Sequence, residues 1–488
     1  MLSYGGPDFP KSLGRKAASF FLVTILISSG CLSNEENKES DNESPEDQIP
    51  ETKPESGQEQ QGADVEVIDI PGSEFCDDTN THHCMLPFPS GAFLAEDSSE
   101  ITGFSLNIDG EAIPDTSSAE SDNMVILDRL DGFSPSTQIF TTFESTPDIV
   151  GMATQFNIST SVEEGHSSIL LNMDTGEKVH HWIELDARAQ DGEPRILFLR
   201  TIEGLDHNAA YAVAFRNLVD GKGVKIPPSD GFRALRDTIN SSSDGIEGQR
   251  SDYETLFSKL DDSGFNRSEL QSAWWFHTAS TESILRDLLI MRDDAELRLG
   301  ESGIGCSITE IQEDFAQDGT SLRLIRGTVT TPHYMETQYA RSPLMRDSDG
   351  NPEFVQNREI DFTMLIPKSL AEDNESGPLT VFGHGLFGDG DSYAINGREL
   401  ANEYKTVVIA TDFKGWSSDG DYDALTFALV DITEFQYQQE RQMQAVINHI
   451  SMVRTITGTC SDIAEFKHNG TNMIDTDTVN YIGISLGG

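Results

Sequence analysis

The stretch Thr478-Val-Asn-Tyr-Ile-Gly-Ile-Ser-Leu-Gly-Gly488 decides how the rest of this sequence is interpreted. Its short apolar run leads into a G-x-S-x-G pattern in which the serine is Ser485. In a nucleophile elbow, the serine occupies a strained turn between a buried parallel strand and a helix, and glycines such as Gly483 and Gly487 keep side chains out of the bend. The pattern therefore predicts that the Ser485 hydroxyl is lifted above the edge of a sheet.

A second strand-ending glycine motif lies upstream, in Leu379-Thr-Val-Phe-Gly-His-Gly-Leu-Phe-Gly388. This apolar run ends in His384 and Gly385. A backbone amide of this motif and the amide just after the serine could together form an oxyanion hole. Because His384 belongs to this motif rather than to a later loop, we expect it to brace the loop rather than to act as a base.

The composition indicates a soluble protein with an unusual charge. A chain of 488 residues is long enough for about two or three domains with a large core. Its 83 acidic and 33 basic residues give a formal net charge of -50. Such a field repels nucleic acid and anionic membrane surfaces, so no nucleic-acid partner is expected, and the charge is interpreted as a strongly solvated surface.

Residues 1–31 have the features of an export signal. Three basic residues precede the apolar run Ala17–Ile27, which is too short for a comfortable transmembrane helix. The small residues before Cys31 resemble the lipobox of bacterial lipoproteins, and this resemblance implies that Cys31 carries a lipid; simple signal cleavage is the alternative. Leu32 is not the aspartate that retains such proteins at the inner membrane, so the resemblance implies the outer membrane and possibly the cell surface.

Two segments are expected to connect domains rather than to form them. Residues 32–64 are acidic and polar with almost nothing apolar, which predicts a disordered linker. Residues 281–305 are expected to form a helical spacer that begins after the cap Ser280. Its apolar positions at helical spacing are Ile284, Leu285, Leu288, Leu289 and Met291.

The four cysteines after Cys31 are even in number, which predicts two disulfides in an exported chain. Proximity favours Cys76 with Cys84. A metal site including His82 and His83 is a weaker alternative, because the spacing fits no standard zinc site and no metal is expected. Calcium at the acidic loops is weaker too, since none follows the EF-hand order of ligands. The disulfide candidates are Cys76, Cys84, Cys306 and Cys460, and the acidic loops are Asp347–Asn351, Asp389–Asp391 and Asp419–Asp423.

Short alternating runs separated by turn residues fill residues 65–280. Alternation of apolar and polar residues is typical of strands with one buried face, so we expect a β-rich, sandwich-like domain. A helical insertion follows from the spacing of Tyr253, Leu256, Phe257 and Leu260. The strands are expected at Ile101–Ile108, Gln138–Phe143, Ser168–Met173, Val179–Leu185, Arg195–Leu199 and Ala210–Phe215.

Four motifs in this region resemble a known family. They are Cys84–Ser90, Asp131–Pro135, Ala212–Asp220 and Ala273–Ser280. They resemble the N-terminal region of large exported bacterial lipoproteins that carry a C-terminal α/β-hydrolase domain, among them the virulence-factor lipases and the surface lysophospholipase of vibrios. The resemblance spans most of residues 76–300 and implies a lipase or esterase without naming its substrate.

The C-terminal residues 306–488 alternate strands with helical stretches, which predicts a parallel α/β sheet. They match the first half of the α/β-hydrolase fold. As in bacterial lipases with a similar His-Gly-Leu-x-Gly segment, the amides of Leu386 and Leu486 are expected to receive the oxyanion while Ser485 attacks an acyl carbonyl. The expected strands are Ser321–Thr328, Ile360–Ile366, Leu379–Phe382, Thr406–Thr411 and Val479–Ile482, and the covering helix contains Met443, Val446, Ile447, Ile450 and Val453.

The sequence therefore predicts a lipid-anchored serine hydrolase that acts on carboxylic esters of small molecules or lipids and needs no cofactor. The alternative is a non-catalytic surface lipoprotein whose β domain binds a partner. A peptidase or acyltransferase would use the same elbow, and the oligomeric state stays open.

In α/β-hydrolases the catalytic acid and histidine follow the serine in the chain. No residue follows Gly488, and none of the four histidines of the C-terminal region occupies the position of the base. The sequence thus predicts a truncated reading frame, unstable or aggregation-prone, with almost no esterase activity. The four histidines are His333, His384, His449 and His468.

Overall fold

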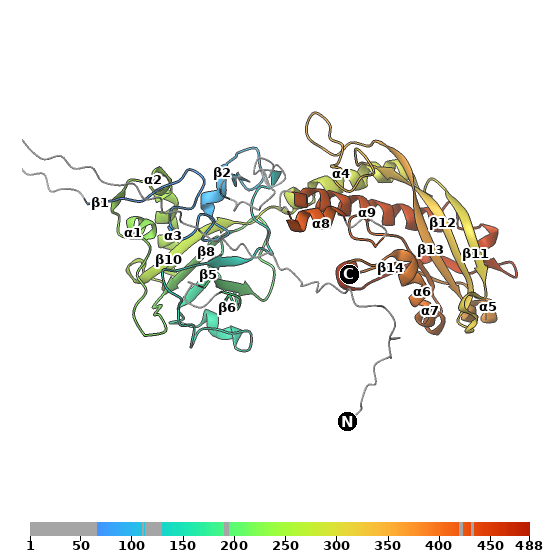
Figure 1. Ribbon diagram of the computed structural model, residues 1–488, viewed down its shortest axis with the longest axis horizontal. Helices are drawn as coiled ribbons and strands as arrows, with labels where there is room; N and C mark the ends of the chain where they lie inside the picture. Colours follow the sequence, from blue (N-terminus) through green and yellow to red (C-terminus); the bar gives the residue numbers. More distant parts are fainter. Residues whose placement is uncertain (1–65, 110–111, 113–128, 190–194, 419–422, 431–433) are drawn as a thin grey trace, which may run out of the picture. The chain divides into compact units, whose positions relative to one another are not determined.

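The computed structural model describes residues 66–109, 112, 129–189, 195–418, 423–430 and 434–488. The predicted signal sequence, Cys31 and the linker 32–64 lie outside the described residues. The described chain has an N-terminal part rich in short strands and a C-terminal part built on one large sheet (Figure 1). Among these residues, no helix combines the length and the apolar character that crossing a bilayer requires.

Two three-stranded antiparallel sheets form the centre of the N-terminal part. One large hydrophobic cluster draws residues from both sheets, including the buried Phe215, Trp274 and Ile183. The prediction of a sandwich-like domain agrees with this shared cluster but stays a prediction. The first sheet has the order β4 (Ile139–Thr141), β7 (Leu197–Thr201) and β6 (His181–Leu185), and the second has β10 (Leu270–His277), β8 (Ala210–Arg216) and β5 (Ser168–Asn172).

Three helices cover the other face of the second sheet. A second hydrophobic cluster joins Ala212 and Ala214 of β8 to apolar residues of these helices, such as Phe232 and Phe257. Because side chains alternate along a strand, Val213 faces the first sheet while its two alanine neighbours face the helices. The second sheet is therefore buried on both faces. The helices are α1 (Asp230–Arg236), α2 (Asp244–Gly248) and α3 (Arg250–Asp262), of which α3 contains the predicted helical insertion.

Two small pairs of strands complete the N-terminal part. One pair is parallel and joins the beginning of the described chain to the segment before α2, and the other is antiparallel. The pairs are β1 (Val67–Ile68) with β9 (Asn240–Ser241), and β2 (Leu94–Glu96) with β3 (Phe104–Leu106).

A six-stranded sheet organises the C-terminal part. Only β15, β14 and β18 run parallel, whereas the other neighbours pair antiparallel. The expectation of a parallel sheet over residues 306–488 is therefore wrong for half of it. Successive antiparallel strands need no crossover helix, and none lies between β11, β12 and β13. The order is β11 (Cys306–Glu313), β12 (Ser321–His333), β13 (Gln356–Pro367), β15 (Val407–Ala410), β14 (Gly377–Gly383) and β18 (Ile474–Gly483).

Helices cover both faces of this sheet. The predicted covering helix is α9 (Phe435–Thr457), whose Met452 and Ile456 pack against alternate strand residues such as Val407 and Ile409. On the opposite face, helices α6 (Gly390–Asn396) and α7 (Arg398–Tyr404) pack against the intervening residues of the same strands. Two shorter helices are α5 (Lys368–Asp373) and α8 (Asp423–Val430), and a small hairpin pairs β16 (Lys467–His468) with β17 (Thr471–Asn472).

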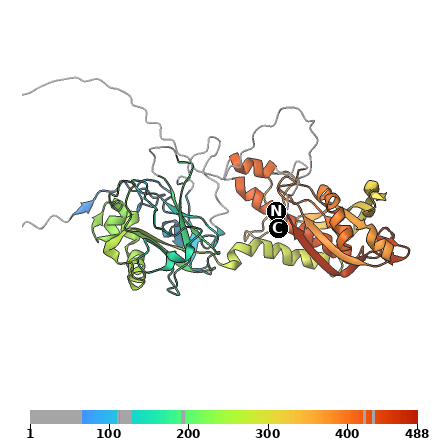
Figure 2. The same ribbon diagram turned by 90° about the horizontal axis from the view of Figure 1, so that it is seen from below.

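The predicted spacer 281–305 contains helix α4 (Thr281–Leu299), the long yellow-green helix of Figure 2. Its cap is Ser280, whose hydroxyl accepts a hydrogen bond from the Ser283 amide. Met291 and Ala295 of α4 are fully buried in a cluster with residues of α9 and of the loop after β12. The helix is therefore part of the C-terminal core rather than a free spacer.

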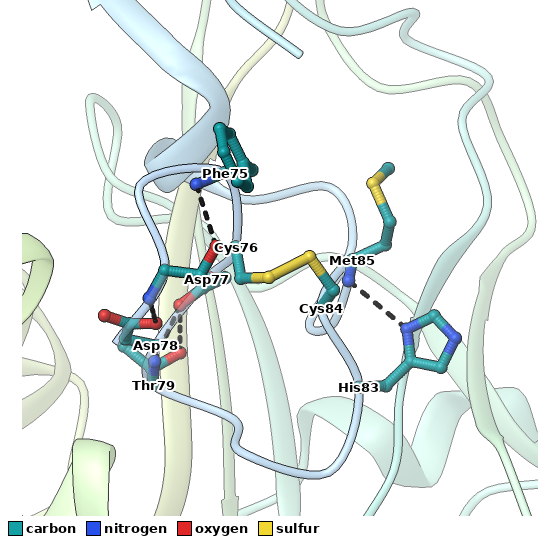
Figure 3. The surroundings of a disulfide bond; sticks show 9 residues. Phe75, Cys76, Asp77, Asp78, Thr79, His83, Cys84 and Met85 are labelled. Atoms are coloured by element: carbon teal, nitrogen blue, oxygen red, sulfur yellow. Dashed lines mark hydrogen bonds between the residues drawn. A yellow bond between two sulfur atoms is a disulfide. The ribbon is translucent and has the colours of Figure 1, made fainter. Parts of the chain in front are cut away.

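Both pairs of candidate cysteines form disulfides. Cys76 and Cys84 are joined at 2.03 Å, the pairing that proximity favoured, and Cys306 is joined to Cys460 at 2.13 Å. In Figure 3 the ring of His83 points away from the disulfide, and its Nδ1 accepts the Met85 amide at 3.2 Å. The sulfurs are thus not free to bind a metal at this loop.

The acidic loops that could suggest calcium have other partners. Asp389 caps α6 by accepting the Ser392 amide at 2.6 Å, and Asp391 pairs with Arg326 at 2.5 Å. Residues 419–422 of the third loop lie outside the described residues. In the part of the chain that the structure describes, no group of three or more His, Cys, Asp or Glu side chains is placed to hold a metal ion.

Candidate functional site

Ser485 lies on a tight turn directly after β18. Its φ of 57° falls in the left-handed region, which a residue with a side chain adopts at a cost of about 1–3 kcal/mol. The turn is closed by the Gly487 amide on the Ile484 carbonyl at 3.0 Å and by the Gly488 amide on the Ser485 carbonyl at 3.1 Å. A Cβ on Gly483 would lie 1.9 Å from the Gly487 carbonyl oxygen, so this position accepts only glycine.

The two glycine motifs lie side by side at the carboxyl ends of neighbouring strands. Gly383 of β14 is in register with Gly483 of β18, and the Ile484 amide donates to the Gly383 carbonyl at 3.2 Å. A Cβ built on Gly385 would stand 3.2 Å from the Cβ of Ser485. The loop after β14 is therefore in van der Waals reach of the serine, and a side chain at Gly385 would crowd it.

The amides around the serine differ in what they bind. The Phe387 amide donates to the Trp416 carbonyl at 2.9 Å, and the Gly388 amide donates to the Gly385 carbonyl at 3.0 Å. Within the described chain, the amides of Leu386 and Leu486 donate no backbone hydrogen bond. These two N–H groups, one on each motif, are thus available to a negatively charged oxygen.

His384 is fully buried and both of its ring nitrogens are occupied. Its Nδ1 lies 2.8 Å from the Gly385 carbonyl oxygen, and its Nε2 accepts the Phe413 amide at 2.8 Å. The two contacts fix the neutral tautomer with its proton on Nδ1. His384 therefore joins the loop after β14 to the loop after β15, a bracing position that leaves no nitrogen for Ser485.

The other histidines of this part lie elsewhere. His449 is buried in α9, where its Nδ1 donates to the Ala445 carbonyl at 2.8 Å, and burial lowers its pKa to about 4. His468 belongs to the small hairpin, and His333 ends β12. The Ser485 hydroxyl makes no hydrogen bond to any described residue. Among the described residues, Ser485 and the amides of Leu386 and Leu486 thus lie on two neighbouring turns, and no basic side chain bonds the Ser485 hydroxyl.

Sequence reasoning missed one residue that supports the turn. The Tyr481 hydroxyl donates to the Gly487 carbonyl, and its ring lies beside Gly383. An aromatic residue on the strand just before a G-x-S-x-G turn was the available signal. The ring of Trp416, in the loop after β15, lies 5.3 Å from that of Phe413.

Comparison with known proteins finds no more than a weak structural similarity. No family model and no curated protein matches the chain. Two solved structures of a rice cell wall degrading esterase, LipA from Xanthomonas oryzae, one of them a ligand-bound form, match at 14% identity with a TM-score of 0.17. The match covers 38% of this chain and 42% of that chain, which is less than half of either. The chain thus has a weak and partial structural similarity to a bacterial esterase.

Proposed function

We propose that the protein is a serine hydrolase of carboxylic esters, with residues 306–488 forming the first half of an α/β-hydrolase domain. Ser485 is the nucleophile, and the amides of Leu386 and Leu486 bind the oxyanion. The observation that carries the proposal is the left-handed Ser485, with φ 57°, held against Gly385 in the loop after the neighbouring parallel strand β14. Strained serines on strand-ending turns are characteristic of nucleophiles in this fold.

The chemistry assigns a separate task to each group. The Ser485 oxygen attacks the acyl carbonyl carbon, and the carbonyl oxygen becomes an oxyanion that the two amides stabilise. Losing one such donor costs on the order of 3 kcal/mol of transition-state stabilisation. The serine proton passes to a base, which returns it to the departing alcohol as the intermediate collapses to an acyl-enzyme. Water then attacks the acyl carbonyl, releasing the carboxylic acid and restoring the serine hydroxyl.

For the polypeptide of residues 1–488 we expect little turnover, because no described base meets Ser485. Binding and the oxyanion amides alone sustain roughly 10³ to 10⁴ over the rate in water in a well-formed triad enzyme. Rapid hydrolysis by this polypeptide, abolished by Ser485→Ala, would show that a base within it reaches the serine.

The test of the activity uses the full translation product of the gene and short-chain nitrophenyl esters. We expect Ser485→Ala to lower kcat at least about 10³-fold, because the nucleophile is removed. Ser376→Ala is the matched control, since Ser376 is an exposed serine of the same sheet region that bonds only the Asn472 carbonyl. Equal hydrolysis by wild type and Ser485→Ala would contradict the proposal.

We further propose that Cys31 carries the lipid and holds the protein at the outer membrane. Several acyl chains on one cysteine suffice for stable anchoring, whereas one is marginal. Cys31→Ser should move the protein from the membrane fraction to the soluble fraction. Continued membrane retention of that variant would contradict the anchor and leave the ester hydrolase proposal untouched.

A non-catalytic surface lipoprotein is the second candidate function. The absence of a base contact at Ser485 within the described chain favours it. The same assay separates the two candidates, because a non-catalytic protein would show no Ser485-dependent hydrolysis in its full translation product.

A further inference from the structure

One polar side chain near Ser485 has no part in the chemistry described so far. Tyr393 belongs to α6, which lies beside β14 (Figure 1) and directly follows the loop of the upstream glycine motif. Its side chain is half-buried, and its hydroxyl forms no hydrogen bond within the described chain. Tyrosine hydroxyls in packed surroundings usually find a hydrogen-bond partner, so this one is available to a ligand.

The Tyr393 hydroxyl lies where the two glycine motifs meet. The position of a Cβ on Gly385 is 3.3 Å from the Tyr393 hydroxyl oxygen and 3.2 Å from the Ser485 Cβ. The Ile484 carbonyl oxygen lies 3.2 Å from the same point. The hydroxyl and the serine therefore border one small space, which exists because Gly385 has no side chain.

Two glycines of the loop after β14 make room for this tyrosine. A Cβ on Gly388 would stand 2.8 Å from the Tyr393 Cε2, which is too close for an ordinary contact. A Cβ on Gly385 would touch the hydroxyl and the serine together. Glycine at both positions thus lets the ring pack against the loop and leaves its hydroxyl open toward Ser485.

Packing fixes the ring of Tyr393 in this position. It meets the ring of Phe382 at 5.5 Å and that of His384 at 5.9 Å, both edge to face. Helix α6 is tied to β12 by Asp391, which pairs with Arg326 at 2.5 Å. A donor that is oriented before the reaction stabilises developing charge well, because no reorganisation is needed when the charge forms.

The hydroxyl lies close to both proposed oxyanion amides. Gly385 directly precedes Leu386, whose amide is one proposed donor. Ser485 directly precedes Leu486, whose amide is the other. Neighbouring Cα atoms are about 3.8 Å apart, so a group beside both Gly385 and Ser485 is in the same small region as the two amides.

We propose that the Tyr393 hydroxyl donates a third hydrogen bond to the oxyanion that forms when Ser485 attacks an acyl carbonyl. The inference rests on the proposed function and deepens it by adding a catalytic residue. The phenol keeps its proton, because it donates a hydrogen bond and transfers no atom. Full negative charge exists on the oxygen only around the tetrahedral intermediate, so the bond is strong there and weak in the uncharged ester complex.

The test compares wild type with Tyr393→Phe in the full translation product of the gene, with short-chain nitrophenyl esters as substrates. The variant keeps the ring and loses only a hydroxyl without a partner in the described chain, so its melting temperature should be unchanged. We expect kcat to fall at least about tenfold while KM changes less than about twofold. Tyr404→Phe is the matched control: it alters an exposed tyrosine of α7 and should keep the wild-type kcat.

Inhibition by a trifluoromethyl ketone is the second measurement. The serine oxygen adds to the ketone carbonyl, and the resulting hemiketal oxygen carries the charge of the oxyanion. Tyr393→Phe should bind this inhibitor at least about tenfold more weakly than wild type does. A tyrosine that only braced the loop would not weaken the inhibitor while leaving KM unchanged.

The outcomes separate this inference from the proposed function. If wild type hydrolyses no ester, the proposed function fails and this inference fails with it. If wild type is active and Tyr393→Phe equals it in kcat and in inhibitor affinity, only this inference is overturned. A lower melting temperature, or a raised KM with unchanged kcat, would also overturn it, because the hydroxyl would then act in folding or in binding the uncharged ester.

Discussion

Strands β8 and β18 both carry apolar side chains, but these side chains are buried in β8 and largely exposed in β18. Residues Tyr211–Phe215 of β8 are at most 1% exposed, because two hydrophobic clusters cover both faces of its sheet. In β18, Val479, Tyr481 and Ile482 are 42%, 53% and 44% exposed. The first strand is central in its sheet, and the second is at the edge of its sheet, beside β14.

The difference indicates which interactions hold each strand in place. Burial on both faces stabilises β8 by close packing, so removing even one methyl group from its side chains is expected to lower the stability. Strand β18 is positioned by hydrogen bonds to β14 and by its glycine turn, and few of its side chains are buried by the described residues. Stability is therefore expected to depend on packing in the N-terminal part and on fewer, longer-range restraints around the serine.

Removing each disulfide in turn tests this contrast between the two parts of the chain. These changes have the largest expected effect on stability. Cys306 and Cys460 are 154 residues apart in the C-terminal part, whereas Cys76 and Cys84 are separated by 8. By loop-closure entropy, replacing the first pair with alanine should cost about 5 kcal/mol of unfolding free energy and replacing the second about 2.5 kcal/mol. Urea denaturation of the two double variants measures both values. A larger loss from the Cys76 and Cys84 pair would break the comparison.

Asp77 provides the next test, in the N-terminal part. Burial raises its pKa to about 6, although the hydroxyls of Ser90 and Thr79 both donate to its carboxylate (Figure 3 shows Thr79). An acid with a raised pKa holds its proton longer in the folded state, so its contribution to stability falls as the pH rises from about 4 to about 6. The expected loss is about 3 kcal/mol.

Denaturation of wild type and Asp77→Asn at pH 4 and pH 7 measures this effect as a difference. The variant should lack about 2 kcal/mol of the fall in stability between the two pH values, because the carboxyl of the unfolded chain is already partly ionised at pH 4. An identical pH dependence in both proteins would show that Asp77 ionises normally in the folded state.

A matched pair of valines gives the smallest and sharpest comparison. Val213 of β8 is fully buried between Leu170 and Trp274 of the neighbouring strands, and Val479 of β18 is 42% exposed. Val213→Ala should cost about 2 kcal/mol, from two lost methylene equivalents and a small cavity, and Val479→Ala less than about 1 kcal/mol. Equal costs, measured by urea denaturation, would show that β18 is as tightly packed as β8.

Much of this architecture could be predicted from the sequence where apolar periodicity was strong. The expected strands at 321–328, 360–366, 379–382 and 479–482 lie within β12, β13, β14 and β18. Strand β11 was not predicted, because it is an edge strand of mostly exposed polar residues and its alternation carries little apolar signal. Strand direction was also missed, since the apolar pattern of a buried strand does not distinguish parallel from antiparallel neighbours.

The candidate site around Ser485 shows the same limit of prediction from sequence. The motif around Ser485 is local, so spacing alone indicated the turn and the neighbouring loop of Gly385. Contacts between separate elements, such as the buried cluster of Met291, Tyr334 and Ile447, carry no local pattern in the sequence. The support that Tyr481 gives to the turn depends likewise on a contact that forms only after folding.

The most direct test of the account is covalent labelling of Ser485 in the full translation product of the gene. The probe is a fluorophosphonate, which reacts with activated serine nucleophiles, and peptide mass spectrometry locates the modified residue. The account predicts one modification per chain, on Ser485, that is lost in Ser485→Ala and kept in Ser376→Ala. Modification of a different serine, or none under conditions that label a known serine hydrolase, would contradict the assignment of Ser485 as the nucleophile.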